Sequence, residues 1–250
     1  MSIHVHKTGL NKTLGQQSDA IITADLIGNW IPGTGVNTHY WDNQVGSGKN
    51  LRRFNTVGNG SSPNHWIFDG TNDYFGAAES GYGGDPFGVN TYNPFTLAQW
   101  FKNDSGVVHV AFSLVYSSSN IAKLIISQSG GTANKAKLTV GSETPVEFDY
   151  TFADDTWYYI SLVYERLTDV WSFFVNGSFV GSSTFSTDNI DSPVLQIGRD
   201  ADTSTYSGGT IKLGHVHVYG EDLKNSQLRQ NFLASHVINN TRLYGATYTA

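Results

Sequence analysis

Two carboxylates at alternating positions of one short segment are the first residues that could do chemistry. Glu147 and Asp149 flank Phe148 in a segment with strand-like composition, so their side chains share one face. Two carboxylates about 5 Å apart can hydrolyse a glycosidic bond, one as the nucleophile and the other as the acid–base group. The commoner interpretation of a Glu/Asp pair at this spacing is a solvated strand surface.

A second group of side chains has the oxygen atoms that calcium prefers. Asp69, Asn72 and Asp73 lie within one turn, and Asp200 and Asp202 lie together in a later loop. Hard cations bind several oxygen ligands, so these five residues are the candidates for a calcium site. Turn chemistry is the simpler explanation, because Asp and Asn side chains bond to the backbone of turns. No cofactor other than calcium is expected.

The pattern His-Val-His occurs twice, at His4/His6 and at His215/His217. Histidines two positions apart share one face of a strand, which could place two imidazoles on one metal ion. The sequence fixes no third ligand nearby. An outward polar face therefore explains both pairs more simply.

Aromatic residues in or beside loops are the candidates for contact with a ligand or a partner. An exposed ring offers contact area at a small entropic cost, and loops often carry function. The alternative is that these rings pin long loops onto the body of the domain. The candidates are Trp30, Trp41, Trp66, Tyr82, Tyr92 and Tyr206. By contrast, Trp100, Trp157 and Trp171 lie in alternating segments and are predicted to be core.

Alternating apolar segments separated by turn residues predict an all-β chain. Asn176-Gly177 between two apolar runs indicates a two-residue hairpin with a type I′ turn. A strand is expected from Ile21 to Trp30, and long loops are expected over residues 31–65. One helix is predicted near Asn225–Val237, with Leu228 and Phe232 on its apolar face and Asn225 or Ser226 as its cap.

Composition excludes several classes of function. Because the 250 residues include no cysteine, disulfides and thiolate-bound metals are excluded. A formal net charge of −6 without a basic stripe argues against a nucleic-acid partner. No run of 18 apolar residues is present, so a membrane span is not expected. Residues 1–20 lack the apolar stretch of a signal peptide.

Three parts are expected along the chain. Residues 1–20 are polar and weakly patterned, and are predicted to be an extended N-terminal arm. Residues 21–240 form the β-sandwich, and residues 241–250 form a C-terminal tail.

Five phrases, in this order, resemble the laminin-G-like domains of the concanavalin A-like lectin/glucanase superfamily. They are Phe68–Tyr74 (FDGTNDY), Phe95–Trp100 (FTLAQW), Trp157–Tyr159 with Val175–Gly177 (WYY with VNG), Leu195–Gly198 (LQIG) and Gly214–Tyr219 (GHVHVY). The resemblance implies a two-sheet antiparallel jelly-roll sandwich with one short C-terminal helix. It also implies calcium near the rim, as in many such domains. Glucanases of the superfamily carry Glu-x-Asp-x-x-Glu or a form one residue shorter. Here Tyr150, Thr151 and Phe152 follow Asp149, so the second glutamate is missing and an enzyme is not expected.

The end of the chain resembles such domains in bacteriophage structural proteins. The matching residues are Leu223, Leu228, Asn231, Phe232 and Arg242–Gly245. This resemblance implies a non-enzymatic virion protein, either a capsid decoration or a tail or fibre component, in a virion assembled in the host cytoplasm. Its expected partners are other virion proteins and further copies of itself. The alternative is a carbohydrate-binding module on a receptor-binding or adhesion protein, with a host surface glycan as ligand.

Overall fold

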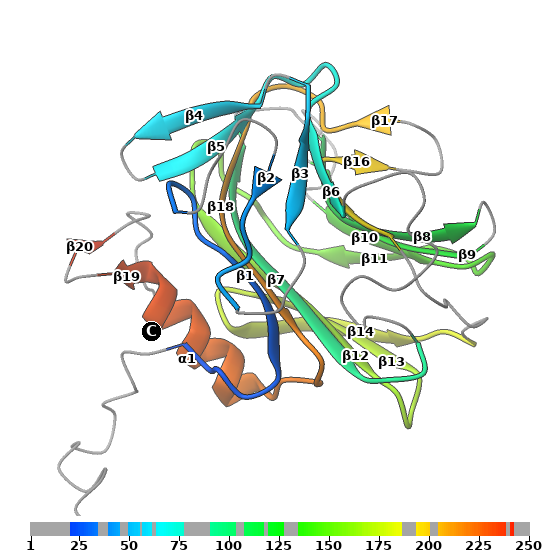
Figure 1. Cartoon of the computed structure of the whole chain (residues 1–250). Coiled ribbons are helices and arrows are strands. Elements are labelled where there is room, and N and C mark those ends of the chain that lie inside the picture. Colours follow the sequence, from blue (N-terminus) through cyan, green and yellow to red (C-terminus); the bar gives the residue numbers. More distant parts are fainter. Residues whose placement is uncertain are drawn as a thin grey trace, which may run out of the picture.

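The computed structural model describes most of the chain between residues 21 and 242 (Figure 1). The described residues are 21–34, 40–45, 50–55, 57–61, 64–77, 91–103, 108–117, 120–127, 135–186, 194–200, 205–238 and 241–242. The predicted arm, residues 1–20, and residues 243–250 of the predicted tail lie outside this set.

Two antiparallel sheets stack face to face, which confirms the predicted sandwich. Sheet A has the order β14-β13-β12-β7-β18-β5-β4, and β1 also pairs with β18. Its strands are β1 (Leu26–Trp30), β4 (Gly58–Ser61), β5 (Asn64–Phe68), β7 (Phe95–Asn103), β12 (Tyr158–Glu165), β13 (Val170–Val175), β14 (Ser178–Thr184) and β18 (Ile211–Tyr219).

Sheet B has the order β11-β10-β9-β8-β15-β6-β3-β2. Its strands are β2 (Tyr40–Trp41), β3 (Leu51–Phe54), β6 (Tyr74–Ala77), β8 (Val108–Ser117), β9 (Asn120–Ser127), β10 (Lys135–Val140), β11 (Val146–Asp149) and β15 (Val194–Ile197). Two short hairpins complete the described strands. They are β16 (Arg199–Asp200) with β17 (Thr205–Tyr206), and β19 (Val237–Ile238) with β20 (Thr241–Arg242).

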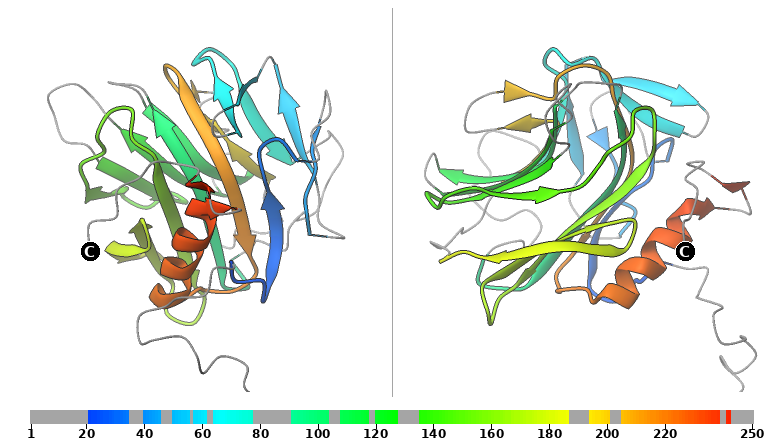
Figure 2. Two further views of the ribbon diagram at one scale, coloured as in Figure 1. Left: turned by 90° about the vertical axis from the view of Figure 1, so that its left-hand side faces the viewer. Right: turned by 180° about the vertical axis from the view of Figure 1, so that it is seen from behind.

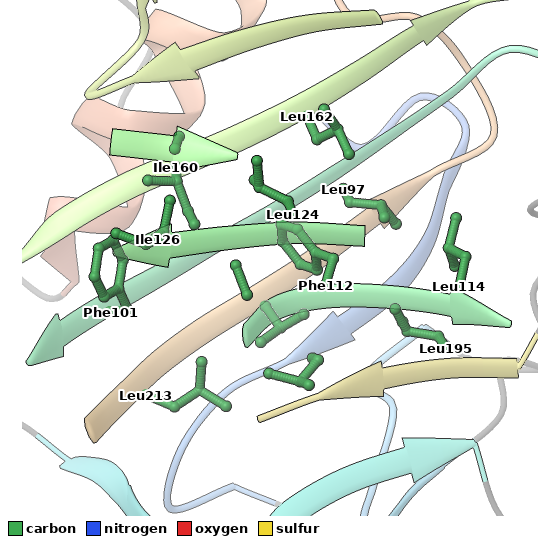
Figure 3. Packing of buried hydrophobic residues seen from close by; sticks show 14 of the residues in the cluster. Leu97, Phe101, Phe112, Leu114, Leu124, Ile126, Ile160, Leu162, Leu195 and Leu213 are labelled. Carbon is green, nitrogen blue, oxygen red and sulfur yellow. The ribbon is translucent and has the colours of Figure 1, made fainter. Parts of the chain in front are cut away.

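Side chains that alternate inward from the two sheets meet in one hydrophobic core. Figure 3 shows this packing, to which sheet A contributes Leu97, Phe101, Ile160, Leu162 and Leu213 and sheet B contributes Phe112, Leu114, Leu124, Ile126 and Leu195. Burying one such side chain is worth about 1.5–3 kcal/mol. The core therefore stabilises the sandwich without any disulfide.

The hairpin predicted at Asn176-Gly177 is present, and both residues have positive φ, 52° and 72°. Such angles are those of a type I′ turn, in which a side chain at the second position is strained. Asn176 also ties the turn to β12: its backbone N–H donates to the carbonyl of Tyr159 at 2.7 Å, and its Oδ1 accepts from the Tyr159 N–H at 2.9 Å. The turn is thereby fixed against the next strand of sheet A.

The predicted helix forms as α1 (Asn225–His236) and covers the outer face of sheet A (Figures 1 and 2). Its start is capped differently from the prediction, because the Lys224 N–H donates to Oε1 of Gln227 at 2.8 Å. This is the glutamine half of a capping box. Within the part of the chain that the structure describes, no helix has the length and apolar character to cross a membrane.

Residues 31–65, which were expected to be mostly loop, contain the short strands β2, β3 and β4 and the start of β5. The strand predicted at Ile21–Trp30 is present as the shorter β1, which begins at Leu26 after a turn at Asp25 with a φ of 53°. Glycines inside these strands are covered by rings: a Cβ on Gly28 would overlap the Trp30 indole, and one on Gly60 would overlap the His65 imidazole. A ring over a glycine supplies the packing that the glycine lacks, so glycine-rich segments can pair as strands here.

Candidate functional site

The two candidate catalytic carboxylates lie on the exposed surface of edge strand β11. The Lys135 ammonium is 2.7 Å from a carboxylate oxygen of Glu147 and 3.7 Å from one of Asp149. The hydrogen bond from Lys135 holds the pKa of Glu147 below its usual value. Both carboxylates are exposed, so this arrangement is a solvated ion pair on the strand surface.

The candidate calcium ligands are engaged in local contacts. Oδ1 of Asp69 accepts from the Thr71 N–H at 2.8 Å, and Oδ2 of Asp73 accepts from the Asp69 N–H at 3.1 Å. The backbone carbonyl of Asn72 accepts from the side-chain amide of Asn55. The bonds of Asp69 and Asp73 are the side-chain-to-backbone hydrogen bonds that Asp residues typically form in turns, which was the simpler interpretation.

The second part of the proposed calcium site is an ion pair. Asp200 is buried, and its carboxylate accepts from the Lys123 ammonium at 2.7 Å. Asp202 lies outside the described residues. Among the residues that the structure describes, no three His, Cys, Asp or Glu side chains are grouped to hold a metal ion.

Three of the six candidate contact aromatics belong to the core. Trp30, Trp41 and Trp66 are at most 1% exposed, and the rings of Trp41 and Trp66 meet edge to face at 5.5 Å. Their burial assigns them to packing, which corrects the expectation of a contact surface at these positions. The core role predicted for Trp100, Trp157 and Trp171 is confirmed, since all three are buried. Tyr82 lies outside the described residues.

Tyr92 does lie on the surface, and it is 48% exposed. The hydroxyl of Tyr164 lies 3.2 Å from the Thr91 carbonyl and donates to Oδ1 of Asp169 at 2.8 Å, so it joins the turn at Tyr92 to the β12–β13 turn. Leu167, which sequence reasoning missed, is 96% exposed in that second turn. We call this pair the Tyr92–Leu167 edge. Exposed apolar side chains on firmly held turns suit contact with another protein.

His215 and His217 share a strand face as expected, but this face is not solvated. Both rings lie on the outer face of sheet A and are buried, which corrects the prediction of an outward polar face. Nδ1 of His217 is 3.1 Å from the Tyr159 hydroxyl. Burial lowers the pKa of His217 to about 4, and burial together with His217 lowers that of His215 to about 3. His4 and His6 lie outside the described residues.

A polar network beside these histidines anchors α1. Asn231 donates through Nδ2 to the Tyr219 hydroxyl at 2.9 Å, and its Oδ1 accepts from the Ile22 N–H at 2.7 Å. The Tyr219 hydroxyl in turn donates to the Ile22 carbonyl at 3.1 Å. Further along the helix, the Trp100 indole N–H donates to Ser235 at 2.8 Å. The helix is therefore fixed by buried hydrogen bonds as well as by apolar contacts.

A second buried histidine group lies between the sheets. Nε2 of His109 is 2.8 Å from the side-chain nitrogen of Gln99, and its Nδ1 is 3.2 Å from the Ser207 hydroxyl. Ser207 also accepts from the Val110 N–H at 3.0 Å. Burial lowers the pKa of His109 to about 3, so the ring is neutral at physiological pH. Because Ser207 is itself buried, this group is structural rather than a nucleophile and its base.

Tyr206, the last candidate aromatic, belongs to a cluster that the sequence did not reveal. We call it the arginine–aromatic ladder: Arg52 and Phe54 on β3, Tyr74 on β6, Arg199 on β16 and Tyr206 on β17. The Arg52 guanidinium lies over the Phe54 ring at 5.0 Å, and that of Arg199 lies over Tyr74 at 5.1 Å and Tyr206 at 5.6 Å. These strands lie together on the side of the molecule away from α1 (Figure 1).

Comparison with known proteins identifies a family and a fold. The family described as the Concanavalin A-like lectin/glucanases superfamily (Laminin_G_3) matches residues 69–229. No curated protein matches the chain.

Three solved structures illustrate the likeness in fold. The Botulinum Neurotoxin Type G Receptor Binding Domain has 13% identity and a TM-score of 0.63, over 84% of this chain and 51% of that chain. The binding domain of Botulinum neurotoxin DC in complex with rat synaptotagmin II has 11% identity and a TM-score of 0.63, over 84% and 52%. The same domain in complex with SialylT has 10% identity and a TM-score of 0.61, over 84% and 52%. The chain thus spans about half of each.

Proposed function

We propose that this chain, which belongs to the concanavalin A-like lectin/glucanases superfamily, is a non-catalytic binding module. We propose further that it is a structural component of a bacteriophage particle. It would decorate the capsid or form part of the tail or fibre. Its partners would be other virion proteins and further copies of itself, and assembly would take place in the host cytoplasm.

One observation carries the non-catalytic part of this proposal. The carboxylate pair that would serve a glycosidase is held by Lys135 on an exposed edge strand, and Glu147 has a lowered pKa. On this proposal the protein acts by binding partner molecules at its surface rather than by catalysis. The Tyr92–Leu167 edge supports it, because its apolar side chains are exposed on turns that Tyr164 holds in place.

The bacteriophage part of the proposal is supported by the resemblance at the end of the chain. Asn231 and Phe232 of that phrase are buried where α1 meets sheet A, so they maintain the fold rather than contact a partner. A sequence match of this kind indicates common ancestry. The presence of the protein in a particle is tested by direct measurement.

A carbohydrate-binding module is the second candidate function. The observation that favours it is the arginine–aromatic ladder, since half-buried aromatic and polar side chains on a sheet are a common setting for sugars. The similar toxin binding domain is found in complex with rat synaptotagmin II and with SialylT.

Purified particles test the leading proposal. We expect the protein in gradient-purified particles at a fixed stoichiometry, measured by quantitative mass spectrometry. The variant Leu167→Asp should reduce incorporation at least about tenfold, because a charge at the Tyr92–Leu167 edge opposes an apolar contact. The matched control is Leu233→Asn at a half-buried position on α1, provided that its melting temperature is unchanged. Absence of the wild-type protein from particles would refute the virion role.

Hydrolysis is tested separately. We expect no release of reducing sugar from β-glucans, and no difference between wild type and Glu147→Gln, because Glu147 is an ion-paired surface residue. The measurement is a reducing-end assay over several days. Activity that Glu147→Gln abolishes would show that the carboxylate pair is catalytic after all.

A further inference from the structure

The arginine–aromatic ladder fixes two guanidinium groups on one outer region of sheet B. The rings of Phe54 and Tyr74 stack in parallel with centroids 4.2 Å apart and an interplanar angle of 2°. Arg52 and Arg199 lie over these rings, and apart from the buried Tyr74 the ladder side chains are partly exposed. The Phe54 ring holds Arg52 by the flat face of its guanidinium, so the N–H edge of Arg52 can donate to a ligand. Arg199 in addition hydrogen-bonds the Tyr74 hydroxyl.

The ladder brings two arginine side chains together in a protein with a formal net charge of −6. Both arginines act on Tyr74: burial raises the pKa of its hydroxyl, and the positive charges of Arg199 and Arg52 oppose that rise. The neighbouring Asp200 carboxylate is neutralised by Lys123. No ion pair between described residues includes Arg52. The charge of Arg52 is therefore available to an anion.

A neutral acceptor lies beside the ladder. Gln196 on β15 pairs directly with Gly76 on β6, and a Cβ at Gly76 would touch Phe54, Tyr74 and Gln196 at 3.2–3.8 Å. Because Gly76 has no side chain, these three side chains can pack directly above its backbone. Oε1 of Gln196 is buried and has no hydrogen-bond partner among the described residues. A buried acceptor without a donor costs about 1–3 kcal/mol, which a ligand hydroxyl would recover once the amide turns outward.

We propose that the ladder and Gln196 form a binding site for a saccharide that carries a carboxylate. The guanidinium edge of Arg52 suits a carboxylate, which it can bind with two parallel hydrogen bonds, and the charge of Arg199 adds to the attraction. The unsatisfied amide oxygen requires a donor, which the hydroxyl groups of a saccharide supply. The site spans three neighbouring positions, β3, β6 and β15–β16, which at about 4.8 Å per strand matches one or two sugar rings.

Calorimetric titration of the full chain with defined sugars tests the site. The acidic probes are sialyllactose and trigalacturonic acid, and the neutral controls are lactose and the methyl ester of trigalacturonic acid. We expect binding of at least one acidic probe and at least about tenfold weaker binding of its neutral counterpart. Arg52→Gln and Arg199→Gln should each weaken binding at least about tenfold, and Arg52→Lys should lose most of that affinity because it lacks the planar fork.

The matched control is Arg166→Gln, which removes the same charge on the distant β12–β13 turn and should leave the affinity unchanged. Melting temperatures show whether each variant is folded, and Arg52→Gln carries the test if Arg199→Gln is not. The site is refuted if no acidic probe binds, if neutral sugars or tetraglutamate bind equally, or if Arg166→Gln weakens binding as much.

This inference rests on the proposed binding function but not on the virion role. If particles contain the protein and no acidic sugar binds, the saccharide site fails alone. If an acidic sugar binds through the ladder and particles lack the protein, the virion role fails and the site stands.

Discussion

Replacing Gly177 with valine is expected to lower the free energy of unfolding by about 2–5 kcal/mol, the sum of backbone strain and overpacking. Gly177 has a φ of 72°, which a β-branched residue adopts only under strain. A Cβ there would lie 2.5 Å from Cα and 3.0 Å from the backbone nitrogen of Arg229 on α1. Because both groups are backbone, the hairpin or the helix has to move, and overpacking of this kind costs about 1–3 kcal/mol beyond the strain.

The control separates strain from collision. Gly141 also has a positive φ, 54°, but a Cβ there would meet nothing within 4 Å. Gly141→Val therefore reports the backbone strain, about 1–2 kcal/mol. Urea unfolding followed by tryptophan fluorescence measures both variants. Equal losses at the two positions would show that the hairpin does not touch the helix.

Acidification is expected to unfold the domain between about pH 4 and 5. A histidine in an unfolded chain has a pKa of about 6.5. The folded values are about 3 for His109 and His215 and about 4 for His217. Below pH 6.5 the unfolded chain therefore binds more protons than the folded one, so stability falls as the pH falls. For each unit that the pH falls, each histidine lowers the free energy of unfolding by about 1.4 kcal/mol. The three histidines together lower it by about 4 kcal/mol per pH unit.

The slope of stability against pH is the diagnostic quantity. His217→Gln removes one titrating group and should reduce the loss between pH 6.5 and 5 by about 1.4 kcal/mol per unit. Its stability at pH 7.5 is compared first, since the variant also changes the contact with Tyr159. Urea titrations at half-unit pH intervals give the slope. A wild-type stability that is flat from pH 7 to 5 would mean that water reaches these rings.

Local chemistry was enough to predict much of the fold. The Asn176-Gly177 turn and the spacing of Leu228 and Phe232 depend on neighbours in sequence, and both predictions are confirmed. The strand that contains Gly28 was predicted, but the short strand around Gly60 was missed, because the ring that covers this glycine is a matter of packing rather than of propensity.

The site residues show the same limit more sharply. Alternation predicts that His215 and His217 share a face, but it does not say that α1 will cover that face. The arginine–aromatic ladder joins Arg52 to Tyr206 across strands far apart in the chain, and no local pattern marks such a set. Tyr206 was the member of this set that the sequence analysis singled out.

The position of β18 has a consequence for how the chain folds during synthesis. β18 is the last strand of sheet A in sequence, yet it lies in the middle, bonded to β7 and to both β5 and β1. Before β18 is available, sheet A can form only as two parts, β14-β13-β12-β7 and β5-β4, with open edges at β7 and β5. These two parts can join only after residue 219 has left the ribosome. Such long-range closure is slow and leaves pairing edges exposed to other nascent chains. The rate of completing this strand, rather than the stability of the finished sandwich, should therefore set the yield of soluble protein.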